Sequence, residues 1–277
     1  MRYERPQTAT QAAQLLANEP GLARILAGGT DVLVQMKAGM VTPDLVVDIK
    51  KIAQIGDIQS EEGGYRIGAA VSGAQLGEHA GVCAQWPGVV EAAQLIGSTQ
   101  VQGRATMVGN LCNGSPAADS VPALVAANAV ARITGPNGTR DCPVADIPAG
   151  PGRTTLTKGE LITSVFLPAR PQGAADAYLR FTPRTEMDIA VASAAVSLTL
   201  DAQGRCCEAR VVLGAVAPRV VLVAEAAAAL IGTHLEPPAL DAIVAACRVA
   251  CAPIDVKRVT VSFRTQVACL LAQYPPV

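Results

Sequence analysis

Aromatic residues and a surplus of positive charge are both missing from this sequence of 277 residues. Phe, Trp and Tyr together make up 3% of the chain, so no platform for stacking nucleic-acid bases is expected. The 22 Lys and Arg residues face 23 Asp and Glu residues, which gives a net charge of −1. Because nucleic-acid binding needs basic groups that neutralise phosphates, this balance argues against DNA or RNA as a partner.

Residues that bind metals or act as nucleophiles are also few or unsuitably spaced. The two histidines, His79 and His234, stand far apart, and no pair among the eight cysteines is spaced C-x-x-C. Zinc sites usually need close Cys or His pairs, and a plant-type iron–sulfur site needs C-x4-C-x2-C. We therefore predict ordinary thiols, no metal ligand and no conventional catalytic residue in this chain.

Long apolar runs are absent as well. The longest alanine-rich stretch, residues 220–231, is interrupted by Glu225, and no run reaches the roughly 18 residues of a membrane-spanning helix. The first residues, Met1 to Pro6, carry charges with no apolar segment behind them, unlike a secretory signal. The sequence thus predicts no membrane span and a cytoplasmic protein.

What the chain does contain is enough apolar sequence, 50% hydrophobic residues, to bury a large core. Residues 1–56 and 57–170 each mix strand and helix patterns and are predicted to form two lobes. The stretch 168–173, rich in Pro and Gly, indicates a linker. Beyond it, residues 175–277 run as three strands followed by helices. The fold class predicted is therefore α+β.

Four local predictions can be made within the two lobes. The apolar run of residues 45–49 is expected to be a buried strand. Residues 132–138 are expected to form a strand that enters a hairpin turn. Residues 106–113 are expected to be irregular. A helix is expected to open at Ser115-Pro116, with Ser as the cap and Pro in the first turn, where its missing N–H costs nothing.

Two glycine-containing segments carry the chemistry. The first glycine segment, residues 26–33 (Leu-Ala-Gly-Gly-Thr-Asp-Val-Leu), follows a predicted strand. Glycines without side chains let backbone N–H groups approach an anion closely. The second glycine segment, residues 106–110 (Thr-Met-Val-Gly-Asn), again offers a hydroxyl, a glycine and an amide. Two such segments could hold one pyrophosphate from two sides.

Each segment taken alone is better explained as an ordinary tight turn. Neither is a G-x-G-x-x-G fingerprint, no Walker A sequence occurs, and residues 113–117 (Asn-Gly-Ser-Pro-Ala) do not match the G-x-S-x-G pattern. Composition and spacing therefore indicate only a candidate nucleotide-binding protein.

Four motifs, taken together and in order, extend this interpretation. They are Ala27-Gly28-Gly29-Thr30-Asp31, Ala105-Thr106-x-x-Gly109-Asn110-Leu111, Ser115-Pro116-Ala117-Ala118-Asp119 and Arg184-x-x-Met187-Asp188-Ile189-Ala190. With the start at Met1 to Pro6, they resemble the FAD-binding medium subunit of the molybdenum hydroxylases, the xanthine dehydrogenase and carbon monoxide dehydrogenase family. The resemblance covers nearly the whole chain.

The resemblance implies a two-lobed FAD-binding module of the vanillyl-alcohol-oxidase type, followed by a domain with a three-stranded sheet and a helical bundle. It further implies that FAD in this chain passes electrons to an external acceptor. The electrons come from two [2Fe–2S] clusters in a small partner subunit, and a large molybdopterin subunit hydroxylates the substrate. A dimer of such heterotrimers is expected. The protein positions a cofactor that supplies the redox chemistry, which fits the missing acid–base residues.

The resemblance also implies the cofactor-binding residues. In chain order they are Leu26, Ala27, Gly28, Gly29, Thr30, Asp31, Val32, Ile96, Gly97, Thr106, Gly109, Asn110, Ser115, Asp119, Ile162 and Arg180. Asp119 matches a position whose carboxylate holds a cofactor hydroxyl, although a first-turn Asp favoured by the helix dipole is an equal alternative. Arg180 matches a position beside the isoalloxazine, with a solvated strand residue as its alternative.

Three residues depart from the family pattern. Val108 stands where the family commonly has a Gly. This larger side chain is expected to shift the cofactor or to weaken its binding. Arg180 replaces the commoner Lys, keeping the charge but changing its shape. Ile189 occupies a position where some branches place an aromatic ring over the flavin.

Two alternative functions stay open on the sequence. A self-sufficient FAD oxidase of the related fold would usually tether the flavin to a histidine, but His79 and His234 lie outside both glycine segments. A flavin-free scaffold subunit is supported only by Val108.

Overall fold

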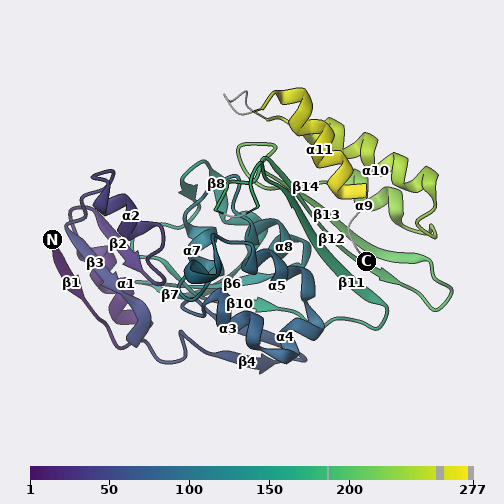
Figure 1. Cartoon of the computed structure of the whole chain (residues 1–277). Coiled ribbons are helices and arrows are strands. Elements are labelled where there is room, and N and C mark those ends of the chain that lie inside the picture. Colours follow the sequence, from purple (N-terminus) through teal and green to yellow (C-terminus); the bar gives the residue numbers. More distant parts are fainter. Residues whose placement is uncertain (186, 254–258, 274–277) are drawn as a thin grey trace.

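The computed structural model describes residues 1–185, 187–253 and 259–273, which form three principal sheets with helices packed against them (Figure 1). The first sheet is built from residues 2–48, the second from residues 58–167 and the third from residues 174–222. The predicted boundaries near 56 and 170–175 fall between these sheets, and as domain boundaries they stay predictions. Residues 186, 254–258 and 274–277 of the predicted last domain lie outside the described residues.

The first sheet is parallel, in the order β1-β3-β2. All four residues of the central strand β3 (Leu45–Asp48) are buried, which explains the nearly continuous apolar run of its sequence. Strand β2 is an edge strand and leads into the first glycine segment. The elements of this part are β1 (Arg2–Glu4), α1 (Ala9–Asn18), β2 (Ala23–Leu26), α2 (Val32–Lys37), β3 and the 3-10 turn η1 (Ile49–Lys51).

The second sheet is antiparallel, in the order β4-β5-β10-β6-β7. The turn between β6 and β7 lies at Pro136-Asn137, where the sequence predicted a hairpin. Its strands are β4 (Ile58–Glu61), β5 (Gly64–Gly68), β6 (Val130–Gly135), β7 (Gly138–Pro143) and β10 (Leu161–Leu167). Its helices are α3 (Gly73–Glu78), α4 (Ala80–Gln85), α5 (Pro87–Gln94), α6 (Thr99–Gln102), α7 (Met107–Cys112) and α8 (Ser120–Ala126); the turn η2 (Val144–Asp146) and the small pair β8 (Pro148–Gly150) and β9 (Arg153–Thr154) complete this part.

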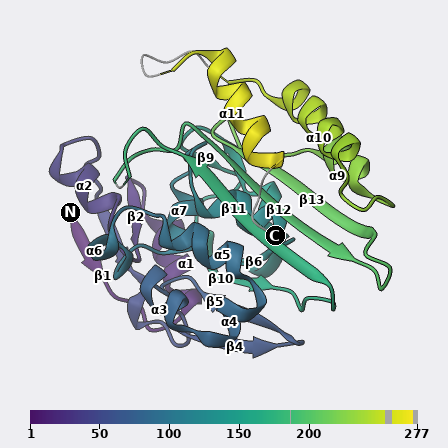
Figure 2. The same ribbon diagram turned by 45° about the vertical axis from the view of Figure 1, so that its right-hand side comes forward.

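The third sheet lies between the second part and the carboxy-terminal helices (Figures 1 and 2). Alternate residues of its strands face the two sides: Ala195 and Val212 join the core of the first two parts, whereas Ala194 and Leu213 join a second core beneath the helices. The elements are β11 (Ala174–Phe181), β12 (Ala192–Leu200), β13 (Cys206–Gly214), β14 (Val221–Leu222), α9 (Ala224–Leu230), α10 (Pro237–Ala250) and α11 (Val261–Gln273). The two-residue β14 adds a fourth strand to the three that were expected.

Two local predictions in the second part were wrong. Residues 107–112 form a helix because the Thr106 side chain accepts the Gly109 N–H at 2.9 Å and so caps it. No helix opens at Ser115-Pro116; α8 begins at Ser120 instead. The Ser115 hydroxyl accepts the Ala117 N–H at 3.2 Å, which closes a single turn.

In the part of the chain that the structure describes, no helix is long and apolar enough to cross a membrane.

Candidate cofactor cleft

The first glycine segment turns sharply between strand β2 and helix α2. Gly29 has φ +81°, a left-handed conformation that favours glycine. Within the described residues, no acceptor receives the backbone N–H groups of residues 28–31. A row of free N–H groups in a turn forms a concavity that suits an anion.

Gly28 brings this segment against the chain just before the second glycine segment. A Cβ added to Gly28 would lie 1.9 Å from the carbonyl oxygen of Arg104 and 3.3 Å from Cα of Ala105. Such contacts are closer than any side chain tolerates, so only glycine fits. The backbone of the first segment therefore lies directly against the chain that leads into the second.

The second glycine segment is held by its own side chains. Thr106 is buried and caps helix α7, and an isolated β-bridge joins it to Ser72. The side-chain oxygen of Asn110 accepts hydrogen bonds from the N–H and the hydroxyl of Ser120, at 3.2 and 2.8 Å. Asn110 thus ties this segment to helix α8, which fixes its orientation.

Both glycine segments line one cleft of about 750 Å³. This volume is within the usual range for small-molecule and cofactor sites. The predicted residues on its wall are Ala27, Gly28, Gly29, Thr30, Asp31, Val32, Ile96, Thr106, Gly109, Asn110 and Ile162. Sequence reasoning therefore placed these eleven residues, which span more than 130 positions, around one space.

Two further predicted residues lie just behind the wall. Leu26 ends strand β2, and its side chain would be met at 2.9 Å by a Cβ on Gly29. Gly97 follows Ile96 with φ +67° and turns the chain between α5 and α6. These two residues shape the backbone of their wall-lining neighbours.

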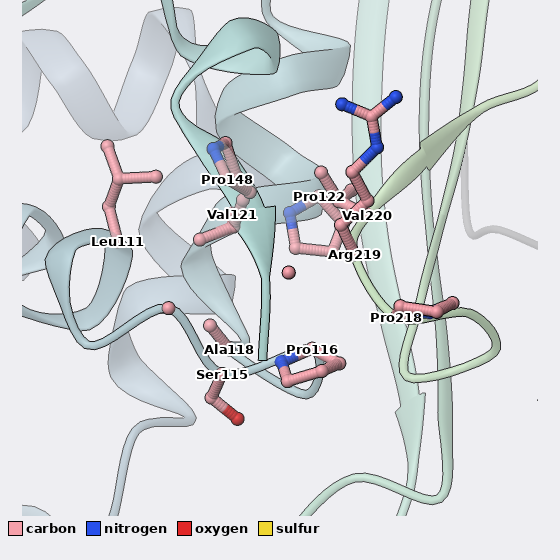
Figure 3. Close-up of a pocket in the computed structure, with 12 residues that line it drawn as sticks. Leu111, Ser115, Pro116, Ala118, Val121, Pro122, Pro148, Pro218, Arg219 and Val220 are labelled. Atoms are coloured by element: carbon pink, nitrogen blue, oxygen red, sulfur yellow. The ribbon is translucent and has the colours of Figure 1, made fainter. Parts of the chain in front are cut away.

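Ser115 lies away from the cleft, in a small pocket between residues 114–122 and the chain before β14 (Figure 3). Pro116 and Pro122 face Pro218 and Val220 across it. Its volume is about 10 Å³, room for about one water molecule. This pocket is too small for a cofactor.

Asp119 and Arg180 are paired with each other. Nη1 of Arg180 lies 2.8 Å from Oδ2 of Asp119, and the Tyr178 hydroxyl donates to Oδ1 at 2.8 Å. The side chains of Asp119 and Arg180 are 11% and 7% exposed. Burial raises the pKa of the Asp119 carboxyl, which the guanidinium and the phenol partly oppose. The pair joins β11 to the turn before α8, and neither residue is on the cleft wall described above.

The departures from the family pattern have clear structural positions. Val108 is buried, 6% exposed, in the first turn of α7 and on the cleft wall. Ile189 is 62% exposed in the connection before β12. At this position the chain therefore presents an exposed aliphatic side chain in place of the aromatic ring of some relatives.

Sequence reasoning missed several residues of the site. The cations Arg24 and Lys158, and the amides Gln35 and Asn113, also line the cleft. Nothing in the sequence marked them, because their neighbours in space come from other parts of the chain. Tyr178 had a usable signal: it stands two residues before Arg180 on a strand, so both point to the same face.

The cleft fits a dinucleotide with a diphosphate. The free N–H groups of residues 28–31 suit phosphate oxygens, and the direct backbone contact at Gly28 keeps side chains out of the junction. The wall includes apolar side chains at Ile96, which is half-buried and offers surface to a flat ring, and at Ile162, which is 2% exposed.

Comparison with known families agrees with this geometry. Residues 1–170 match the family described as FAD binding domain in molybdopterin dehydrogenase. Residues 177–273 match the CO dehydrogenase flavoprotein C-terminal domain.

Individual proteins resemble the chain over most of its length. It is 34% identical to the carbon monoxide dehydrogenase medium chain of Afipia carboxidovorans over 266 residues, 96% of this chain and 92% of that one. It is also 34% identical to a putative xanthine dehydrogenase FAD-binding subunit of Escherichia coli, over 78% of this chain and 74% of that one. A solved carbon monoxide dehydrogenase from Hydrogenophaga pseudoflava superimposes with a TM-score of 0.94 at 30% identity, covering 99% of this chain and 94% of that one.

Proposed function

Because this chain belongs to the family of FAD-binding subunits of the molybdopterin dehydrogenases, we propose that it holds one FAD in the cleft between its two glycine segments and transfers electrons within a molybdenum hydroxylase. It is an oxidoreductase subunit. The observation that carries the proposal is the cleft itself, which is lined by residues 28–31, whose N–H groups are free, and by the second glycine segment.

The residues of the cleft would divide the work of binding. The backbone N–H groups of residues 28–31 would receive the diphosphate, and Thr30 would add its hydroxyl. The second glycine segment would contact the cofactor from the other side of the cleft, through Thr106, Gly109 and Asn110. Ile96 and Ile162 would contact the flat rings and exclude water from them.

Asp119 and Arg180 would act at the far side of the cofactor as a preorganised pair. A cation held by a buried carboxylate cannot swing away, so it would keep a positive charge near an anionic reduced flavin. Their contact with FAD is a prediction, as is that of Ser115, Leu26 and Gly97. Bound FAD would supply the redox chemistry, accepting electrons one or two at a time and releasing them to an acceptor.

The proposed assembly follows the names of the relatives, which are medium chains or FAD subunits of dehydrogenases. We further propose that the chain assembles with a small subunit that holds two [2Fe–2S] clusters and with a large molybdopterin subunit. Two such heterotrimers would form a dimer, located in the cytoplasm. A partner with clusters would bring electrons to the flavin, since this chain has no metal cluster motif of its own.

The test is to purify the full chain with whatever proteins accompany it in its native cell. The proposal expects a flavin absorption spectrum, FAD released on denaturation, and co-purifying iron–sulfur and molybdenum proteins. A complex that contains no flavin would contradict it and favour the scaffold alternative. Oxidation of alcohols or amines by the isolated chain would favour the self-sufficient oxidase.

A further inference from the structure

A lysine outside the cleft contacts the first glycine segment. Nζ of Lys50 donates a 3.2 Å hydrogen bond to the carbonyl oxygen of Ala27 and lies 2.7 Å from Oδ1 of Asp48. Ala27 is on the cleft wall, whereas Lys50 is not among the residues that line the cleft. The ammonium group therefore holds a residue of the cleft wall without itself lining the cleft.

Asp48 is a fixed anchor for this lysine. It is 3% exposed at the end of the central strand β3, and its carboxylate also accepts the Lys50 N–H at 3.0 Å and the Tyr3 hydroxyl. Arg5 adds a cation at 3.8 Å. Burial acts to raise the pKa of Asp48, but the hydrogen bonds from Lys50 and Tyr3 hold it below its usual value. The carboxylate stays charged, so the anchor persists across neutral pH.

The geometry of the peptide bond carries this contact to the other side of the segment. The described residues contain no cis peptide bond, so the carbonyl of Ala27 and the N–H of Gly28 point in opposite directions across one plane. A hydrogen bond that holds the Ala27 oxygen toward Lys50 therefore points the Gly28 N–H away from Lys50. That N–H has no acceptor among the described residues.

We propose that Lys50, anchored on Asp48, is a positioning residue that orients the first glycine segment toward the diphosphate of a dinucleotide. The inference rests on the proposed function, since it assumes that the cleft binds FAD. Lys50 acts through the peptide between Ala27 and Gly28 and makes no contact with the cofactor itself.

The test compares Lys50→Met with Lys51→Met in the full chain. Methionine retains an unbranched apolar stem similar to that of lysine and removes the ammonium group. Lys51 is exposed, and its side chain makes no hydrogen bond or ion pair within the described residues, so it controls for the loss of one surface charge. FAD affinity is measured by titrating the flavin-free chain, and the melting temperature is measured with and without FAD. A third variant, Lys50→Arg, retains the donor.

Lys50→Met is expected to raise the Kd for FAD about tenfold. It also takes a cation from the buried Asp48 carboxylate, so the melting temperature of the flavin-free chain should fall as well. The stabilisation that FAD adds should shrink accordingly. Lys51→Met should bind as the wild type does, and Lys50→Arg should come within about threefold of it. A purely structural lysine would instead lower the melting temperature of the flavin-free chain and leave the Kd for FAD unchanged.

If Lys50→Met binds FAD as tightly as the wild type does, this inference is overturned but the proposed function is not. A lower melting temperature of the flavin-free variant with no loss of affinity would have the same consequence. If Lys50→Met does not fold, a Lys50→Arg chain that folds yet binds FAD no better than a Gly28→Ala chain would overturn it too. A wild-type chain that binds no FAD would overturn the proposed function, and this inference with it.

Discussion

Replacing Gly28 by alanine is expected to separate the two glycine segments. The added Cβ would lie 1.9 Å from the Arg104 carbonyl oxygen and 2.7 Å from its carbon. A carbon and a carbonyl oxygen approach no closer than about 3.3 Å in favourable contacts, so the backbones must part by roughly 1.4 Å. Both atoms belong to the main chain, so no side-chain rotation can relieve the clash.

The expected magnitude follows from this displacement. Hydrogen bonds of about 2.9 Å between the segments and a diphosphate would lengthen to roughly 4 Å, beyond hydrogen-bond distance. Losing two bonds to a charged group, at about 1.5 kcal/mol each, corresponds to roughly 100-fold weaker FAD binding. Forcing extra volume into a packed contact should also cost about 1–3 kcal/mol of stability.

The assay is the fluorescence titration of flavin-free Gly28→Ala with FAD, together with its urea unfolding curve. Gly103→Ala is the matched control: this glycine lies one residue before Arg104, has φ −64°, and its added Cβ would meet nothing closer than 3.8 Å. FAD binding by Gly28→Ala within threefold of the wild type would refute the reasoning. An equal loss of affinity in Gly103→Ala would refute it as well.

Three further predictions concern the surroundings of the cleft. Arg180→Met should destabilise the chain by about 3 kcal/mol because it leaves the buried Asp119 carboxylate without its cation, and Asp119→Asn in the same chain should recover much of this loss; equal unfolding free energies of the single and double variants would contradict the pairing. Thr106→Ala should cost about 1 kcal/mol through loss of the α7 cap and should weaken FAD binding, while Thr106→Ser should retain both properties in the same assays. The Arg140 hydrogen bond lowers the pKa of Glu160 from 4.5 to about 2, so the stability that Glu160 provides is complete above about pH 4.5 and is lost as the pH falls toward 2. Urea midpoints of the wild type and Glu160→Gln should therefore differ most at pH 7 and converge near pH 2, and a constant difference across this range would argue against the ion pair.

The local sequence determined much of the fold. Apolar runs such as residues 45–48 predicted buried strands, and the hairpin between β6 and β7 was marked by its turn residues. The family motifs identified the two glycine segments and the cofactor class. These features depend on interactions between residues close in the chain, which periodicity and turn chemistry record.

Predictions failed where the local sequence was compatible with two backbone conformations. The Ser115-Pro116 pair has the chemistry of a helix start, yet its hydroxyl closes a single turn and α8 begins five residues later. The segment 107–112 contains a glycine and a β-branched residue, which disfavour a helix, but capping by Thr106 and packing of Met107 and Leu111 into the core outweigh those preferences.

The tertiary structure alone decided which distant residues share a site. Asp119 and Arg180 are 61 positions apart and pair only because β11 packs beside α8. Lys50 reaches Ala27 because β3 and β2 are neighbours in one parallel sheet. Sequence patterns record what a residue needs from its nearest neighbours, whereas such partnerships depend on how sheets stack. For this protein the sequence therefore determined the elements and the cofactor class, and the packing of the three sheets determined the cleft and the charges around it.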